Sequence, residues 1–143
     1  MNGKKWDKRF LELAKLVGSW SKDPSTQVGA VIADDHNRIV SIGFNGFPKG
    51  VKDCEKRLVD REEKYAIIVH AEANALMFAN GSVEGCTLYT WPFQPCSRCA
   101  GLIIQSSIKR VVCPYSDDER WKKNFELARQ LFNESGIILE WID

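Results

Sequence analysis

Residues 70–80 read His-Ala-Glu-Ala-Asn-Ala-Leu-Met-Phe-Ala-Asn, and residues 95–104 read Pro-Cys-Ser-Arg-Cys-Ala-Gly-Leu-Ile-Ile. Each stretch predicts a helix, because the first is rich in Ala, Leu and Met and the second has a proline before an apolar run. Residues two apart on a helix point about 200° away from each other, so His70 and Glu72 cannot both face one site from the middle of a helix. We therefore place His70 at the first helical residue or just before it. Cys96 and Cys99, three apart, share a helix face.

These two helix starts carry three side chains that bind zinc, namely the imidazole of His70 and the thiols of Cys96 and Cys99. Three protein ligands leave the fourth position of a zinc ion open for water, which is typical of a catalytic rather than a structural site. The positive end of each helix dipole favours the thiolate forms. Glu72 is predicted to be the general acid and base, and not a ligand. This pair of motifs is typical of zinc-dependent nucleobase deaminases.

Simpler readings exist for each motif alone. A Cys-x-x-Cys pair can be a redox pair or half of a structural zinc site, and a single His-x-Glu triplet carries little information. The order of the motifs and the helix predicted at each favour the deaminase. A non-catalytic zinc module would have no use for Glu72 beside an open zinc position.

Length and composition are typical of a single domain that comprises residues 1–143. The chain is 44% hydrophobic and shows neither a membrane span nor a signal peptide, so we expect a cytoplasmic protein that binds no membrane. The 20 basic and 19 acidic side chains are spread along the chain, which favours a small-molecule substrate over a nucleic acid. The other three cysteines, Cys54, Cys86 and Cys113, are expected to be reduced.

The remaining sequence alternates between predicted helices and strands. Residues 51–64 form a charged stretch without a strong period, which is typical of a functional or disordered loop. The order of elements predicts a three-layer α/β/α domain with a mixed five-stranded sheet. Apart from the two motif helices, the predicted elements are a helix over 6–18, hairpin strands over 28–33 and 38–44, strands over 86–90 and 110–113, a helix over 118–135 and a strand over 137–141.

The zinc motifs belong to a longer pattern. The run Ser-Lys-Asp-Pro-Ser-Thr-Gln-Val-Gly-Ala over 21–30 and the run Ile-Gly-Phe-Asn-Gly-Phe-Pro over 42–48 precede them, and Ile-Ile-Gln-Ser over 103–106 follows. With these runs, residues 6–140 closely resemble deoxycytidylate (dCMP) deaminases of the cytidine deaminase-like superfamily. The resemblance implies hydrolysis of dCMP to dUMP and ammonia, which feeds dTTP synthesis. It also implies a homohexamer that dCTP with Mg²⁺ activates and dTTP inhibits.

The resemblance extends to substrate-binding positions, for which simpler explanations also exist. The amide of Asn45 can bind a sugar hydroxyl, although Asn-Gly is also a common turn pair. Lys22 is a candidate cation for the 5′-phosphate, or a solvated surface lysine. A ring from residues 91–94 could stack on the pyrimidine or belong to the core. The further candidates are Thr26, Ala71 and Tyr115, with Arg120 as a replacement for an arginine that some relatives have after the tyrosine.

Regulatory positions follow from the same resemblance. Gly46, Lys49 and Phe78 match the region of the family's effector site, although Phe78 could equally be a core residue at helical spacing. Some relatives bind a second, structural zinc through a histidine two residues before the catalytic one. Ile68 occupies that position here, so we expect one zinc per chain. The alternative substrates are a free cytidine or deoxycytidine and an adenosine in tRNA.

Overall fold

The computed structural model of the chain describes residues 2–142. Five strands form one sheet in the order β2-β1-β3-β4-β5. β1 (Gly29–Ala33) pairs antiparallel with β2 (Ile39–Phe44) and with β3 (Thr87–Trp91). β4 (Arg110–Cys113) runs parallel to both β3 and β5 (Ile138–Trp141). The predicted mixed five-stranded sheet is therefore confirmed.

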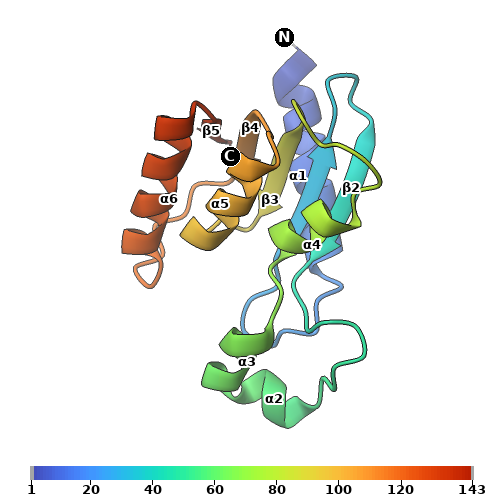
Figure 1. The fold of residues 1–143 in the computed structure, drawn as a ribbon, viewed down its shortest axis with the longest axis vertical. Helices are drawn as coiled ribbons and strands as arrows, with labels where there is room; N and C mark the ends of the chain where they lie inside the picture. Colours follow the sequence, from blue (N-terminus) through green and yellow to red (C-terminus); the bar gives the residue numbers. More distant parts are fainter. Residues whose placement is uncertain (1, 143) are drawn as a thin grey trace.

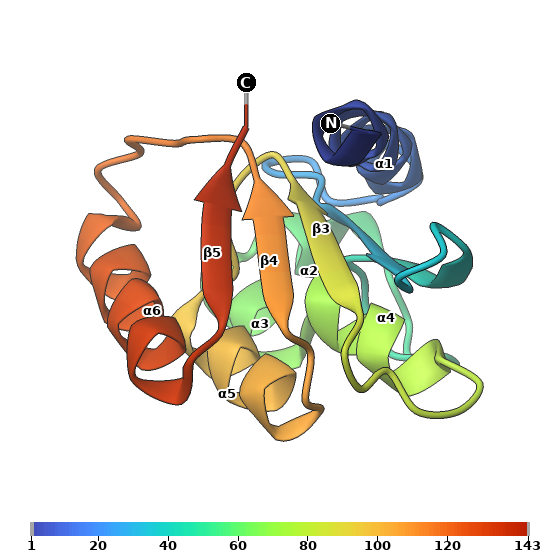
Figure 2. The same ribbon diagram turned by 90° about the horizontal axis from the view of Figure 1, so that it is seen from above.

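Helices cover both faces of the sheet (Figures 1 and 2). α1 (Asn2–Gly18) packs against one face, where Phe10, Leu11 and Ala14 are buried against the strands. α4 (Ala71–Phe78), α5 (Ser97–Gln105) and α6 (Lys122–Ser135) cover the other face and enclose the larger core. The result is the predicted three-layer α/β/α arrangement. No helix within residues 2–142 combines the length and the apolar composition needed to cross a bilayer.

Two sequence-based expectations about local structure were wrong. Residues 51–64 are not a continuous loop, because they include α2 (Glu55–Val59) and the first part of α3 (Arg61–Ile67), which lie at the lower end of the molecule in Figure 1. Asp60 caps α3 by accepting a hydrogen bond from the Glu63 N–H at 3.2 Å. α6 begins at residue 122 instead of 118, because Asp118 accepts backbone hydrogen bonds in a turn.

A buried polar network attaches α1 to the sheet. The Tyr89 hydroxyl donates to Asp7 Oδ1 at 2.7 Å, and the Arg110 guanidinium donates to both oxygens of the same carboxylate. The Asp7 side chain is only 3% exposed. Because each buried charge has a partner of opposite sign, the network can exist in the low-dielectric interior.

Close packing between β2 and α4 determines where the first motif lies. Gly43 faces α4, and a Cβ at this position would come within 2.5 Å of Ala75 N and 2.6 Å of Ala71 O. Only glycine allows the helix to approach the strand this closely. The Asn74 side chain adds a hydrogen bond to the Phe44 carbonyl at 2.8 Å. These contacts hold the first turn of α4, and thus His70 before it, at the end of the sheet.

Candidate active site

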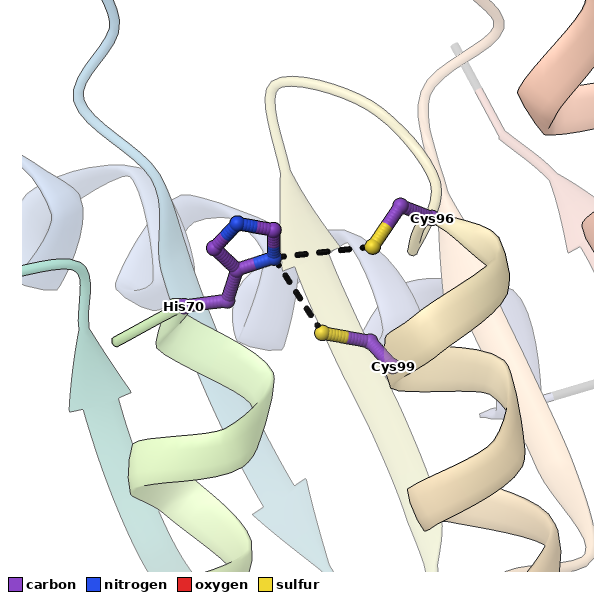
Figure 3. A group of neighbouring side chains, drawn as sticks. All are labelled: His70, Cys96 and Cys99. Atoms are coloured by element: carbon purple, nitrogen blue, oxygen red, sulfur yellow. Dashed lines mark hydrogen bonds between the residues drawn. The ribbon is translucent and has the colours of Figure 1, made fainter. Parts of the chain in front are cut away.

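Three side chains of the types that bind zinc converge at the starts of α4 and α5. His70 is the N-cap of α4 and Cys96 is the N-cap of α5, both with extended backbone, whereas Cys99 lies within the first turn of α5. His70 Nδ1 lies 3.5 Å from Cys96 Sγ and 3.3 Å from Cys99 Sγ. Figure 3 shows the ring and both sulfurs pointing toward one another from the two helix starts. The predicted position of His70 just before its helix agrees with the structure.

This donor set fits a zinc ion. A tetrahedral zinc with its usual bond lengths separates a nitrogen and a sulfur ligand by about 3.6 Å, close to the two N···S distances given above. All three donor atoms lie within 4.8 Å of one another, and no second cluster of metal-ligand side chains occurs within residues 2–142. One imidazole and two thiols match the preference of zinc for nitrogen and sulfur. The expected stoichiometry of one zinc per chain remains a prediction.

The start of α5 is fixed by α6. Asn124 Oδ1 accepts a hydrogen bond from the Ser97 N–H at 2.9 Å, and Asn124 Nδ2 donates to Ser97 Oγ at 3.0 Å. Asn124 thus caps α5 from outside, since the side chain of the N-cap residue Cys96 makes no capping hydrogen bond. The free Cys96 sulfur can therefore face the His70 ring.

The site favours negative charge at Cys96 and positive charge at His70, whereas the hydrogen bond with Cys96 and burial raise the pKa of the Cys99 thiol. A hydrogen bond from Cys99 lowers the pKa of the Cys96 thiol, and a hydrogen bond with Cys96 raises the pKa of His70. Burial opposes both shifts, because it disfavours the charged form of either group. A site that stabilises thiolate in this way is prepared for a cation.

Glu72 lies beside the donors but is not one of them. It belongs to the first turn of α4, and only 4% of the residue is exposed. Burial raises the pKa of its carboxyl from 4.5 to about 7. A carboxyl group with a pKa close to neutrality can both accept and release a proton, as a general acid and base must.

His70, Cys96 and Glu72 line a cavity of about 420 Å³, whereas Cys99 is buried and does not line it. Three of the predicted substrate-binding residues, Thr26, Asn45 and Ala71, line this cavity. Aromatic side chains also line it, with ring centroids 5.4 Å apart between Phe93 and Phe125 and 5.9 Å apart between Trp121 and Phe125. Of the rings in residues 91–94, it is Phe93 that reaches the cavity, whereas Trp121 was not among the candidates.

Two predicted substrate-binding residues do not lie on the cavity. Lys22 forms an exposed ion pair with Asp53 at 2.7 Å, and Tyr115 packs edge-on against Trp141 with centroids 5.0 Å apart. Arg120, the suggested replacement near Tyr115, does line the cavity and pairs with Asp118 at 2.9 Å.

Sequence reasoning missed three further charged residues of the cavity: Asp23, Lys64 and Arg98. Asp23 and Lys64 form a buried ion pair of 3.0 Å between residues 41 apart in sequence. No local pattern could have indicated this pairing, because it depends on where α3 packs. Arg98 lies between the two cysteines of the motif, but its direction toward the cavity depends on how α5 is placed.

The predicted effector residues lie next to the candidate site. Gly46 forms a two-hydrogen-bond bridge with Val69, the residue before His70, at 3.1 and 2.8 Å. Lys49 Nζ lies 4.9 Å from the centre of the Phe78 ring at the end of α4. Phe78 is 55% exposed, so it is not a core residue in the chain described here.

A family model described as "Cytidine and deoxycytidylate deaminase zinc-binding region" matches residues 4–114. The chain belongs to this family. The predicted resemblance to the cytidine and deoxycytidylate deaminases is thereby confirmed, and the His70, Cys96 and Cys99 cluster falls within the matched residues.

Relatives in this deaminase family match nearly the whole chain. The protein named "Uncharacterized deaminase in luxG 3'region" of Aliivibrio fischeri is 48% identical over 141 residues, which cover 96% of this chain and 94% of that protein. The human deoxycytidylate deaminase is 41% identical and covers 92% of this chain and 76% of its own length. The crystal structure of the cyanophage S-TIM5 dCMP deaminase in complex with dCMP and dUMP matches with a TM-score of 0.78 at 25% identity, over 96% and 97% of the two chains.

Proposed function

We propose that the protein is a zinc-dependent dCMP deaminase, which hydrolyses dCMP to dUMP and ammonia. The observation that carries the proposal is the convergence of three zinc donors, two of which line one cavity together with the buried, non-coordinating Glu72. The names of the human relative and of the cyanophage protein support dCMP as the substrate.

In this mechanism, His70, Cys96 and Cys99 would hold the zinc. A zinc bound there would bring the pKa of a water molecule to about 7 and so supply the nucleophile. Glu72 accepts a proton from the attacking water and passes it to the ring nitrogen beside the reacting carbon. It then takes the second proton from the hydroxyl that is now bonded to the ring carbon and gives it to the amine, which departs as ammonia while the carbonyl forms. Because Glu72 is buried, bulk water does not compete for the proton that it carries.

The cavity offers a contact for each part of the nucleotide. Phe93 and Trp121 present apolar rings to the pyrimidine, and Asn45 lies where a sugar hydroxyl can meet its amide. Arg98 and Arg120 are exposed cations on the cavity wall, so they are the proposed partners of the 5′-phosphate. Lys22 and Tyr115 would have to move before they could reach it.

Ammonia release from dCMP, deoxycytidine and CMP, measured side by side on zinc-loaded protein, tests the proposal. We expect dCMP to give a higher kcat/KM than deoxycytidine, because only a monophosphate uses the cationic wall, and CMP shows whether a 2′-hydroxyl is accepted. Preference for deoxycytidine would point to a nucleoside deaminase. Turnover of none of the three by a protein with a full complement of zinc would contradict the proposed function and favour a non-catalytic zinc module.

Regulation and assembly extend the proposal. We propose a homohexamer in the cytoplasm, feeding dTTP synthesis, that binds dCTP with Mg²⁺ as activator and dTTP as inhibitor near Gly46, Lys49 and Phe78. The bridge from Gly46 to Val69 supports this, because an effector that displaces Gly46 acts one residue away from His70. An effector must bind two conformations with different affinity to have any influence. Hyperbolic dCMP kinetics that neither nucleotide changes would contradict this extension.

A further inference from the structure

The buried carboxylate of Asp23 organises the loop over residues 23–28. Its Oδ1 accepts hydrogen bonds from the N–H groups of Ser25 at 2.8 Å and Thr26 at 3.2 Å. The same oxygen lies 3.0 Å from Lys64 Nζ, and the side chains of Asp23 and Lys64 are only 6% and 4% exposed. A carboxylate buried to this extent needs a partner of opposite charge. Lys64 of α3 therefore offsets the cost of burying the Asp23 carboxylate and, through Asp23, holds the loop in place.

The same loop orients the amide of Asn45. Asn45 Nδ2 donates to the Thr26 carbonyl at 3.0 Å and to Asp23 Oδ2 at 3.4 Å, and Asn45 Oδ1 accepts from the Val28 N–H at 2.9 Å. A side-chain amide has two N–H donors and one oxygen with two lone pairs. Both donors are thus occupied. One lone pair of Oδ1 is the position left for a ligand in the cavity, which Asn45 lines.

We propose that Lys64 is a positioning residue that makes Asn45 a hydrogen-bond acceptor for the substrate. Through Asp23 it holds the Asn45 amide in the orientation that presents Oδ1 to a sugar hydroxyl. This inference rests on the proposed function for the identity of the sugar, which in dCMP offers the 3′-hydroxyl. Recognition of that hydroxyl then depends on α3, a short helix outside the sheet layers (Figure 1).

The test combines the variant Lys64→Met with a substrate that lacks the hydroxyl. In the wild type, 2′,3′-dideoxycytidine monophosphate should have a kcat/KM about five- to tenfold below that of dCMP, which is the usual effect of one hydrogen bond. Lys64→Met should lower kcat/KM for dCMP by a similar factor and bring the two substrates within about twofold of each other. Arg57→Gln is the matched control, because it removes a cation and an exposed ion pair from the same α2–α3 segment.

Two kinetic outcomes would overturn the proposal. A loss of equal size on both substrates, with the discrimination intact, would show that Lys64 has a purely structural role. A loss on dCMP that exceeds the loss on deoxycytidine, again with intact discrimination, would place Lys64 at the phosphate. If the wild type acts on none of these substrates, the proposed function fails, and crystal structures of the wild type and Lys64→Met decide the role of Lys64. An unchanged loop over 23–28 and an unchanged Asn45 amide in the variant would refute it.

Discussion

Replacement of Glu72 separates proton transfer from metal binding. Its side chain lies in the first turn of α4, is almost fully buried, and does not belong to the group of three zinc donors. Glu72→Gln keeps the size and polarity of the residue but removes its ability to accept a proton. The zinc content should therefore remain that of the wild type.

The size of the expected effect follows from the burial of Glu72. General acid and base catalysis typically contributes about 10²- to 10⁴-fold to a rate. A partly exposed residue can be replaced in part by water or buffer, whereas Glu72 is only 4% exposed. We therefore expect kcat for dCMP to fall by about 10³- to 10⁴-fold, which corresponds to about 4 to 5.5 kcal/mol in the activation barrier.

The assay is ammonia release under saturating dCMP, with zinc measured by atomic absorption on the same samples. Glu84→Gln is the control, because Glu84 is an exposed glutamate in the loop before β3. It should have the activity and the zinc content of the wild type. If Glu72→Gln keeps kcat within about tenfold of the wild type, Glu72 is not the proton carrier. If it loses zinc, Glu72 acts on the metal site.

Three further variants test the metal site and the fold. Cys99→Ala should lose zinc together with activity, because it removes one of three donors; full zinc occupancy by atomic absorption would be inconsistent with the assigned site. Asp7→Asn should reduce the free energy of unfolding in urea by about 3 kcal/mol, since it leaves the Arg110 charge without its buried partner. A change below about 1 kcal/mol would show that the network matters little. Gly29→Ala should prevent folding as judged by circular dichroism, because the added Cβ would overlap the Ala14 carbonyl oxygen; a native spectrum would mean that α1 can shift away from β1.

Helix starts were predictable because they depend on short-range chemistry. The Ala-rich run after His70 and the proline before Cys96 both indicate helices, and the structure begins α4 at residue 71 and α5 at residue 97. The alternating apolar strands, with turn residues between them, likewise predicted the five strands to within one or two residues at most ends. The short helices α2 and α3 escaped prediction, because helices of this length are not stable by local preference alone.

The substrate contacts were less predictable than the metal donors. Lys22 and Lys64 each lie next to a cavity-lining residue in the sequence. Lys22 is nevertheless paired with Asp53 at the surface, whereas Lys64 is buried against Asp23. Nothing in the neighbouring residues distinguishes them. The difference arises from packing of the α2–α3 segment against the loop over 23–28.

The sequence by itself determined the reaction chemistry that we propose for this protein. The residue types and spacing at His70, Glu72, Cys96 and Cys99 indicate the three donors that the structure brings together and the proposed proton carrier, because ligand preference and helix geometry act over a few residues. Only the tertiary structure decided which side chains share the cavity. Asp23, Asn45 and Lys64 form one hydrogen-bonded unit although they lie far apart in the chain. The buried environment in which Asp23 and Lys64 pair exists only once the chain has folded.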